Sequence, residues 1–261
     1  MNQYSANLFS ETEKSKQLFN LDTHQIIFDR YHFAGELSDG MDVLEVGCGS
    51  GIGLEYLDKI ATNLDAIEYS KENFSKLQVL EKGNARVRQG DAHKLPYDNH
   101  KFDLVIALAM IYYLSLTKFL EESSRVLKEN GTIFFCTSNK DVPGFVPAPY
   151  TTKYYSIPEL NLELSKAGYD VDFYGAFPAN NQIILVRVFM AWVKFFFKAL
   201  FGFTKKGKQI WEQARAKKAG KLFPLPMKLT SDNISCTERI CLNPNKKNRD
   251  YRVIYVVAKK K

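Results

Sequence analysis

The feature that most constrains this chain is a short glycine-rich segment that directly follows an apolar run. Residues 43–53 read Val-Leu-Glu-Val-Gly-Cys-Gly-Ser-Gly-Ile-Gly, and residues 54–60 have helix-forming composition. Glycine at every second position permits a tight strand-to-helix turn, and the missing Cβ lets the main chain approach a ligand closely. The segment therefore predicts a parallel α/β sheet with a nucleotide-cofactor loop at the end of its first strand.

An acidic residue follows the next apolar run. Residues 64–67 read Leu-Asp-Ala-Ile and are expected to form a second parallel strand that ends at Glu68, where a carboxylate can accept both hydroxyls of a ribose. A dinucleotide-binding loop needs the spacing Gly-x-Gly-x-x-Gly. Its sixth position holds Ile52 when counted from Gly47 and Leu54 when counted from Gly49. Neither alignment of the motif places a glycine at the sixth position, so a dinucleotide cofactor is disfavoured.

Four motifs along the chain resemble the class I S-adenosylmethionine-dependent methyltransferases. They are Glu45-x-Gly47-x-Gly49-x-Gly51, residues 89–97 (Gln-Gly-Asp-Ala-His-Lys-Leu-Pro-Tyr), residues 102–107 (Phe-Asp-Leu-Val-Ile-Ala) and residues 126–132 (Val-Leu-Lys-Glu-Asn-Gly-Thr). In order, they resemble the family's first motif, its adenine-contacting turn, its fourth strand, and the helix end and turn before its fifth strand. Each motif alone is a weak signal, whereas their common order and spacing are specific.

The resemblance implies S-adenosylmethionine as the cofactor and S-adenosylhomocysteine as its product. It places the glycine loop at the amino-acid end of the cofactor, Glu68 at the ribose, and Asp91 with Ala92 at the adenine. The implied cofactor-binding residues are Glu45, Gly47, Gly49, Gly51, Glu68, Tyr69, Asp91, Ala92 and Leu108. Glu45 would orient the methionine amino group, and Leu108 would offer a backbone contact there.

Alternating apolar and helical stretches predict the fold class. Strands are expected near 42–46, 64–68, 86–89, 103–107 and 132–137, with helices near 51–61, 70–82 and 116–129. A sixth strand over 169–177 and a final strand over 252–258 follow. This pattern predicts a Rossmann-like α/β sheet of seven strands, mostly parallel and covered on both faces. The resemblance implies that the last strand is antiparallel.

The expected organisation has four segments. Capping patterns at Ser10 and near Asp22 predict an N-terminal helical flap over residues 1–38. The cofactor-binding core is expected over 39–177 and its final strand over 251–261. Between them, residues 178–250 form an insertion much longer than a usual connection between strands.

The insertion differs from the rest of the chain in charge. Residues 178–261 hold 19 Lys or Arg against 4 Asp or Glu, a net +15, whereas residues 1–177 hold 17 against 25, a net −8. Within the segment 183–208, basic residues share one helical face beside aromatic and aliphatic residues. No run of about 18 uncharged apolar residues exists, which disfavours a transmembrane span. A helix in an anionic membrane interface, a lid over the acceptor pocket and a subunit interface such as a homodimer remain open.

The sequence does not single out a catalytic base, and the candidates are His24, His93, Tyr112 and Tyr113. A hydroxyl acceptor must lose its proton during or after methyl transfer. His93 follows the adenine turn, and His24 lies in the expected flap. Tyr112 and Tyr113 follow the fourth strand, where many members of the resembled family carry histidines. Tyr154 lies after the fifth strand, at another edge of the expected acceptor cavity.

Cysteine spacing gives no metal-binding pattern. Cys236 and Cys241 have no histidine nearby in the sequence to complete a zinc set, and the expected metal content is none. Four cysteines without a paired motif, and no basic-apolar leader, favour reduced thiols and a cytoplasmic location, with membrane association left open.

Together these features predict methyl transfer from S-adenosylmethionine to a small or medium-sized acceptor. An oxygen of a glycan, lipid-linked or isoprenoid-type intermediate is favoured, because the basic and aromatic insertion suits an anionic or membrane-associated molecule. An RNA methyltransferase is the enzymatic alternative, and nucleic acid is the less favoured partner because no recognition motif is present. A non-catalytic cofactor-binding subunit is the alternative from another class.

Overall fold

A computed structural model describes residues 18–19, 21–79, 83–179, 223–230 and 236–261. In chain order its helices are α1 (Leu21–Ser38), α2 (Leu54–Asp58), α3 (Lys71–Leu77), the 3-10 helix η1 (Ile111–Tyr113), α4 (Leu116–Val126) and α5 (Ile157–Lys166). Its strands are β1 (Leu18–Phe19), β2 (Asp42–Val46), β3 (Asn63–Glu68), β4 (Arg86–Gln89), β5 (Phe102–Leu108), β6 (Leu127–Ser138), β7 (Tyr169–Pro178), β8 (Phe223–Pro224), β9 (Ile240–Cys241) and β10 (Tyr251–Lys260).

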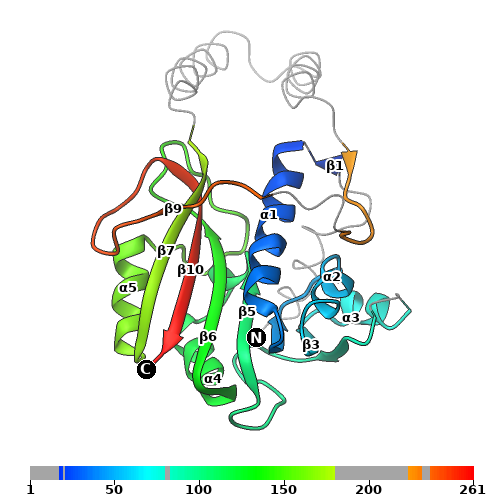
Figure 1. The fold of residues 1–261 in the computed structure, drawn as a ribbon. Helices are drawn as coiled ribbons and strands as arrows, with labels where there is room; N and C mark the ends of the chain where they lie inside the picture. Colours follow the sequence, from blue (N-terminus) through cyan, green and yellow to red (C-terminus); the bar gives the residue numbers. More distant parts are fainter. Residues whose placement is uncertain (1–17, 20, 80–82, 180–222, 231–235) are drawn as a thin grey trace.

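The main sheet has the strand order β4-β3-β2-β5-β6-β10-β7-β9. Strands β4, β3, β2, β5 and β6 are parallel to one another, and β10 runs antiparallel to both β6 and β7. The predicted mixed sheet with an antiparallel last strand is therefore confirmed. The two-residue strand β9, which the sequence did not predict, adds an edge beyond β7. In Figure 1 the β10 arrow points opposite to its neighbours.

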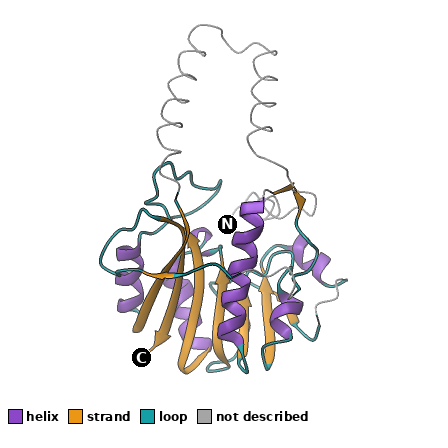
Figure 2. Ribbon diagram, turned by 45° about the horizontal axis from the view of Figure 1, so that its top comes forward, coloured by secondary structure: helices purple, strands orange, loops and turns teal. Residues whose placement is uncertain are grey.

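Helices cover both faces of this sheet, so its central strands are buried on both sides (Figure 2). One core cluster combines the sheet with apolar residues of α4 and α5, including Phe119, Leu120 and Leu160. The other combines the opposite face with α1, α2 and α3 and includes Leu57 and Leu77. The buried loop residues Cys48 and Ile52 belong to the second cluster, which anchors the glycine loop to the core.

Helix α1 is part of the second layer. We expected residues 1–38 to form a flap ahead of the sheet, but α1 packs on the sheet and buries Ile27, Tyr31 and Ala34. The reason is its apolar face, together with a carboxylate, Asp29, that has no exposed surface. Asp29 accepts hydrogen bonds from the Tyr255 hydroxyl at 2.5 Å and from the backbone N–H of Thr237 at 2.6 Å.

The helices are shorter than the sequence pattern suggests. The expected helix over 51–61 is reduced to α2 because the glycine turn continues to Gly53, and α3 ends at Leu77. The expected helix over 116–129 ends at Val126, since Leu127 already pairs with Phe102 in the sheet. Asn130 takes a positive φ of 59° within β6, so the Asn-Gly pair bends a strand instead of ending a helix.

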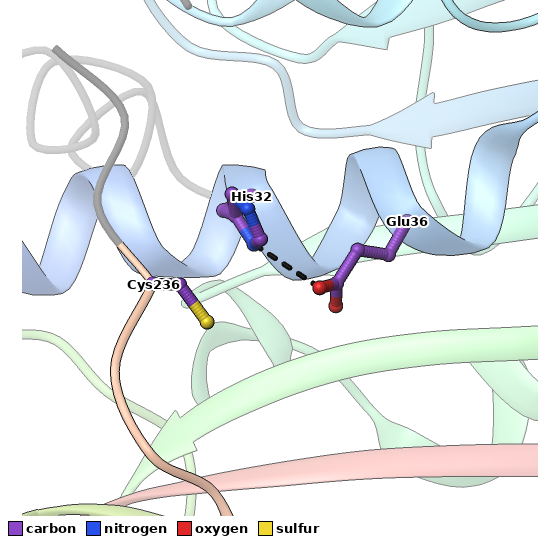
Figure 3. Close-up of side chains that lie close together, drawn as sticks. All are labelled: His32, Glu36 and Cys236. Atoms are coloured by element: carbon purple, nitrogen blue, oxygen red, sulfur yellow. Dashed lines mark ion pairs between the residues drawn. The ribbon is translucent and has the colours of Figure 1, made fainter. Parts of the chain in front are cut away.

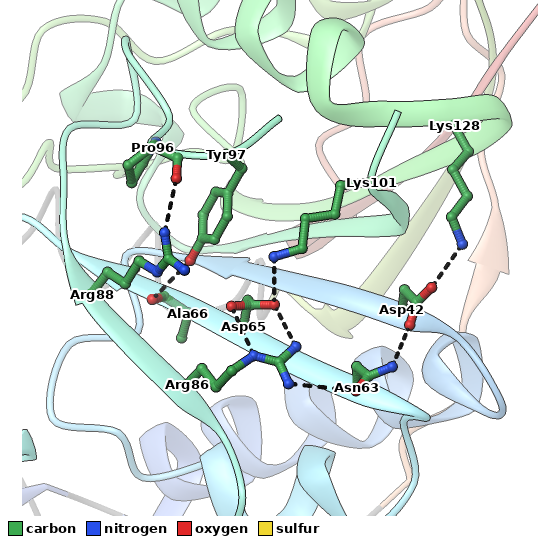
Figure 4. A network of polar contacts seen from close by, with 10 residues as sticks. All are labelled: Asp42, Asn63, Asp65, Ala66, Arg86, Arg88, Pro96, Tyr97, Lys101 and Lys128. Atoms are coloured by element: carbon green, nitrogen blue, oxygen red, sulfur yellow. Dashed lines mark hydrogen bonds and ion pairs between the residues drawn. The ribbon is translucent and has the colours of Figure 1, made fainter. Parts of the chain in front are cut away.

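Ion pairs hold the amino ends of the strands together, at the edge of the sheet opposite the glycine loop (Figure 4). Asp65 is buried and binds the Arg86 guanidinium at 2.7 Å and the Lys101 ammonium at 3.1 Å. Although burial raises the pKa of Asp65, the hydrogen bonds from Arg86 and Lys101 outweigh it and hold this pKa below its usual value. Lys128 similarly bridges Asp42 and Asp103, each at 2.8 Å.

The described ends of the insertion pack on the core. Strand β8 pairs with β1, and Leu229 is buried while its N–H donates to the Ile52 carbonyl at 2.9 Å. Lys228 lies 2.7 Å from Glu55 of α2. The segment 183–208 and the capping pattern at Ser10 lie outside the described residues. Among the helices that the structure describes, none is long and apolar enough to span a membrane.

Candidate cofactor site

The glycine loop connects β2 to α2 and has the backbone geometry that its sequence predicts. Gly47, Gly49 and Gly51 all have positive φ, at 74°, 58° and 76°. L-residues with a Cβ rarely adopt this region, so the alternating glycines are a requirement of the turn. The N–H groups of Gly47 and Cys48 both donate to the Ile67 carbonyl, at 2.9 and 3.1 Å, which fixes the loop against the end of β3.

Glu68 ends β3 and faces the glycine loop. Its carboxylate accepts the Gly49 N–H at 2.9 Å and the Ser70 N–H at 2.7 Å, one on each oxygen, and the side chain is buried. A carboxylate is an acceptor-only group that can take several hydrogen bonds, hydroxyl protons included. A cradle of positive-φ glycines beside a fixed, acceptor-only carboxylate fits a cofactor that carries a ribose diol.

Glu45 is a buried residue of β2 and not a solvent-facing strand end. Only 1% of it is exposed, and its Oε1 accepts a hydrogen bond from the Tyr31 hydroxyl at 2.8 Å. The Tyr31 ring also covers Gly53, where an added Cβ would lie 2.0 Å from a ring carbon. Helix α1 therefore fixes both the first-motif acid and the far end of the glycine loop.

The expected adenine side of the site is a surface pocket of about 400 Å³, lined by Tyr69, Lys71, Gln89, Gly90 and Asp91. Tyr69 is 39% exposed, whereas Ala92, which follows Asp91 in the chain, is buried. The pocket lies next to Glu68, because the N–H of its lining residue Gly90 donates to the Glu68 carbonyl at 3.1 Å. The structure thus brings the expected ribose and adenine residues together. Leu108 ends β5 and is buried.

The hydrogen bonds of His93 are those of a structural residue. Its Nδ1 lies 2.9 Å from the Asp91 carboxylate, and its Nε2 accepts the Ser115 N–H at 3.0 Å. Because Nε2 is an acceptor, the proton of the neutral ring resides on Nδ1 and points to Asp91. Both nitrogens are engaged between the adenine turn and the start of α4, which disfavours His93 as a general base.

The tyrosine candidates belong to an aromatic cluster after β5 and β6. The ring of Tyr112 stacks on Tyr154, with centroids 4.5 Å apart, and lies 4.8 Å from Tyr113. Phe145 meets Tyr154 edge-on at 4.8 Å. Burial raises the pKa of Tyr112 far above its usual value, so its phenolate is not accessible near neutral pH. The cluster is suited to packing against an acceptor and poorly suited to removing a proton.

His24 lies in the first turns of α1 and is buried, with its ring 5.9 Å from that of Phe28. Sequence reasoning missed Tyr31, since its contact with Glu45 depends on how α1 packs against β2. It also missed Phe145 as a partner of the tyrosines. In the sequence, the only indication of Phe145 is that it is an aromatic residue in the long loop that follows the fifth expected strand.

Known proteins match the same part of the chain. Residues 44–135 match the family model described as "Methyltransferase domain". A probable S-adenosylmethionine-dependent methyltransferase from Mycolicibacterium smegmatis is 26% identical over 165 residues, covering 59% of this chain and 62% of that protein. A ubiquinone biosynthesis O-methyltransferase from Pelagibacter ubique is 28% identical over 118 residues, covering 43% of this chain and 48% of that protein.

A solved structure is also similar to this chain. The chain is similar to a SAM-dependent methyltransferase from Aquifex aeolicus, with a TM-score of 0.51, 27% identity, and coverage of 59% of this chain and 86% of that one. With the glycine loop and Glu68, these matches support a Rossmann-like methyltransferase domain in this chain. Over that domain the chain is similar to S-adenosylmethionine-dependent methyltransferases. It spans about half to three fifths of the length of the curated relatives described above.

Proposed function

We propose that this protein transfers a methyl group from S-adenosylmethionine to an oxygen of a small or medium-sized acceptor. The observation that carries the proposal is the pairing of the positive-φ glycine loop with the Glu68 carboxylate at the ends of β2 and β3. Bound there, the cofactor supplies an activated methyl group. The chain's own residues then have to hold the acceptor in line with it and out of water.

Four residues are proposed to hold the cofactor through distinct contacts. Glu68 accepts the ribose hydroxyls, while Glu45, kept in place by Tyr31, orients the methionine amino group. Asp91 and the exposed ring of Tyr69 line the adenine pocket. A carboxylate fixed by two backbone N–H groups needs little reorganisation on binding, which favours affinity.

The acceptor is proposed to be a glycan, lipid-linked or isoprenoid-type molecule with the methylated oxygen near the aromatic cluster. The stacked rings of Tyr112 and Tyr154 offer an apolar wall that suits a ring or an aliphatic chain. Oxygen is favoured over nitrogen because a matched relative is named an O-methyltransferase of ubiquinone biosynthesis. The end of the insertion packs on Ile52 and Glu55, beside the cofactor loop, which supports a role for the insertion at the acceptor side.

The cofactor part of the proposal is tested by titrating S-adenosylmethionine and S-adenosylhomocysteine calorimetrically into wild-type protein and Glu68→Gln. A hydrogen bond to a charged group contributes about 1.5–3 kcal/mol, so the affinity for both should fall roughly 10- to 100-fold. Glu163→Gln is the control, since Glu163 belongs to α5 and lies 3.5 Å from Lys166. Equal affinity in wild type and Glu68→Gln contradicts the ribose role.

The acceptor part is tested by following S-adenosylhomocysteine formation with three sets of acceptors. These are isoprenoid phenols and lipid-linked glycans, soluble metabolites of matched size, and RNA transcripts. Turnover with the first set is expected. Turnover confined to uncharged soluble metabolites removes the basis of the lipid or glycan acceptor, and turnover only on a defined transcript makes the protein an RNA methyltransferase. Cofactor binding without turnover until a partner is added would indicate a non-catalytic subunit.

A further inference from the structure

Three potential metal ligands meet on the outer side of α1. His32 and Glu36 lie one helical turn apart, and Cys236 comes from the segment that crosses this helix before β9 (Figure 3). One ligand atom from each of the three residues lies within 4.8 Å of the other two. The sequence alone gave no zinc spacing, because Cys236 is 200 positions from Glu36. We propose that His32, Glu36 and Cys236 form a binding site for a divalent transition-metal ion of the zinc type.

The donor set selects the kind of metal. A thiolate, an imidazole nitrogen and one carboxylate oxygen are the ligands of Zn²⁺ and of its substitute Co²⁺, whereas Mg²⁺ and Ca²⁺ prefer oxygen alone. In a tetrahedral site with bonds of about 2.0–2.3 Å, the ligand atoms lie about 3.3–3.8 Å from one another. Closing the cluster to these separations requires movements of about 1 Å. Exposed Cys236 and half-exposed Glu36 can make them by rotamer changes.

His32 supplies an independent indication. Its Nδ1 is buried and makes no hydrogen bond within the part of the chain that the structure describes. The nearest acidic group is Glu36 Oε1, 3.4 Å away, in poor hydrogen-bond geometry. A buried ring nitrogen of this kind is unusual in native proteins and is explained when it coordinates an ion. With three protein ligands, a water would complete the tetrahedron.

Arg239 lies in the same cluster as His32, Glu36 and Cys236. Its guanidinium lies 2.6 Å from Glu36 Oε2, donates to Cys236 Sγ at 3.3 Å, and stacks on the Phe33 ring with a centroid distance of 3.9 Å. A metal ion and a guanidinium compete for the same negative charges. Metal binding therefore displaces Arg239 from Glu36 and Cys236 while the stacking on Phe33 can persist. Metal binding would thus connect α1 with the segment after residue 236, in place of the ion pair of Arg239. This role does not depend on methyl transfer.

The experiment is a titration of chelator-treated full-length protein with Co²⁺, followed by Zn²⁺ competition. Wild type is expected to bind one Co²⁺ per chain with a thiolate-to-cobalt charge-transfer band, and Zn²⁺ should remove that band. Cys236→Ser should abolish the band, and His32→Gln should weaken binding by more than the roughly 10- to 100-fold that loss of an outer-shell partner costs. Cys241→Ser is the matched control, since Cys241 is also exposed but lies in β9.

Arg239→Gln distinguishes a metal site from a simple ion-pair cluster. Removal of the competing cation should tighten Co²⁺ binding, whereas a cluster that only holds an ion pair would show no gain. Should Cys236→Ser fail to fold, the wild type still provides a test, because Zn²⁺ should protect Cys236 and not Cys241 from alkylation. Absence of a thiolate band, its persistence in Cys236→Ser, or equal alkylation of both cysteines with Zn²⁺ would overturn the inference.

Discussion

At the scale of single residues, the glycine loop requires both a left-handed backbone and the absence of a Cβ. The two requirements can be separated experimentally. Gly51 has a φ of 76°, and a Cβ added there would lie 2.4 Å from Leu77 Cδ2. Gly40 has a similar φ of 69°, but a Cβ there would meet nothing within 4 Å. The pair therefore distinguishes backbone strain alone from backbone strain plus steric crowding.

We predict that Gly40→Ala lowers the free energy of unfolding by about 1–2 kcal/mol, the usual cost of a left-handed L-residue. Gly51→Ala should cost about 1–3 kcal/mol more, because the methyl group overpacks against Leu77. Only Gly51→Ala should also lose affinity for S-adenosylhomocysteine. Urea unfolding and calorimetry measure both effects. Equal losses of stability in the two variants would show that crowding at Leu77 does not matter.

The sequence predicts the residues whose roles depend on local backbone geometry and misses those that depend on packing. Gly47, Gly49, Gly51 and Glu68 are evident because a tight turn and a strand-end carboxylate leave local signatures. Tyr31 leaves none, since its hydroxyl reaches Glu45 only after α1 has packed on β2. His93 is predicted as a loop residue, but its double hydrogen bond to Asp91 and Ser115 is visible only in the structure.

At the scale of elements, α5 has the capping box that its sequence predicts. The Ser156 N–H and hydroxyl both donate to Glu159, at 2.6 and 2.8 Å, and Lys140 pairs with the same carboxylate. Burial raises the pKa of Glu159, but the hydrogen bonds from Lys140 and Ser156 outweigh this and lower it from 4.5 to about 2. A carboxyl whose folded pKa is depressed stabilises the fold above its unfolded pKa, and this contribution is lost as the pH falls.

We therefore predict that Glu159→Gln destabilises the protein by about 0.2–1 kcal/mol at neutral pH, because the charge that pairs with Lys140 is lost while the cap at Ser156 remains. The difference from wild type should begin to shrink as the pH falls below 4.5 and should largely vanish near pH 2. Urea unfolding at a series of pH values measures it. Glu163→Gln in the same helix serves as the control and should show a small difference throughout. A difference that grows on acidification would contradict the assignment.

Element boundaries were less predictable than element types. Strands β2, β3, β4 and β5 lie within one residue of their expected bounds, and apolar runs mark the buried strands β2, β3 and β5 directly. Helix α4 ends three residues earlier than expected, since pairing of Leu127 with Phe102 competes with helix propagation. Strand β9 could not be foreseen, because a two-residue edge strand has no periodicity.

At the scale of the whole molecule, the basic insertion is the part whose role stays a proposal. Its segment 183–208 lies outside the described residues, and its residues 223–230 pack beside the cofactor loop through Leu229 and Lys228. A positive surface near an active site can bring the protein to anionic lipids or bring an anionic acceptor to the site.

We predict that the protein co-sediments with anionic liposomes at physiological salt and that a variant lacking residues 183–208 does not. The physical reason is the shared basic face and the apolar residues of that segment, because apolar insertion resists screening by salt. Neutral liposomes and S-adenosylhomocysteine binding by the deletion variant are the controls. Without binding at physiological salt, the segment would be a lid or a subunit contact, and soluble acceptors would come first.

The position of β10 has a consequence for how the chain folds during synthesis. In the sheet, β10 lies between β6 and β7. In the chain, however, residues 179–250 separate β10 from β7, so β10 is translated last. Until residue 260 has left the ribosome, β6 and β7 each carry an unsatisfied hydrogen-bonding edge toward the gap. Such edges are prone to pair with other nascent chains. During synthesis, chaperones would therefore meet a cofactor domain in which the facing edges of β6 and β7 are still exposed.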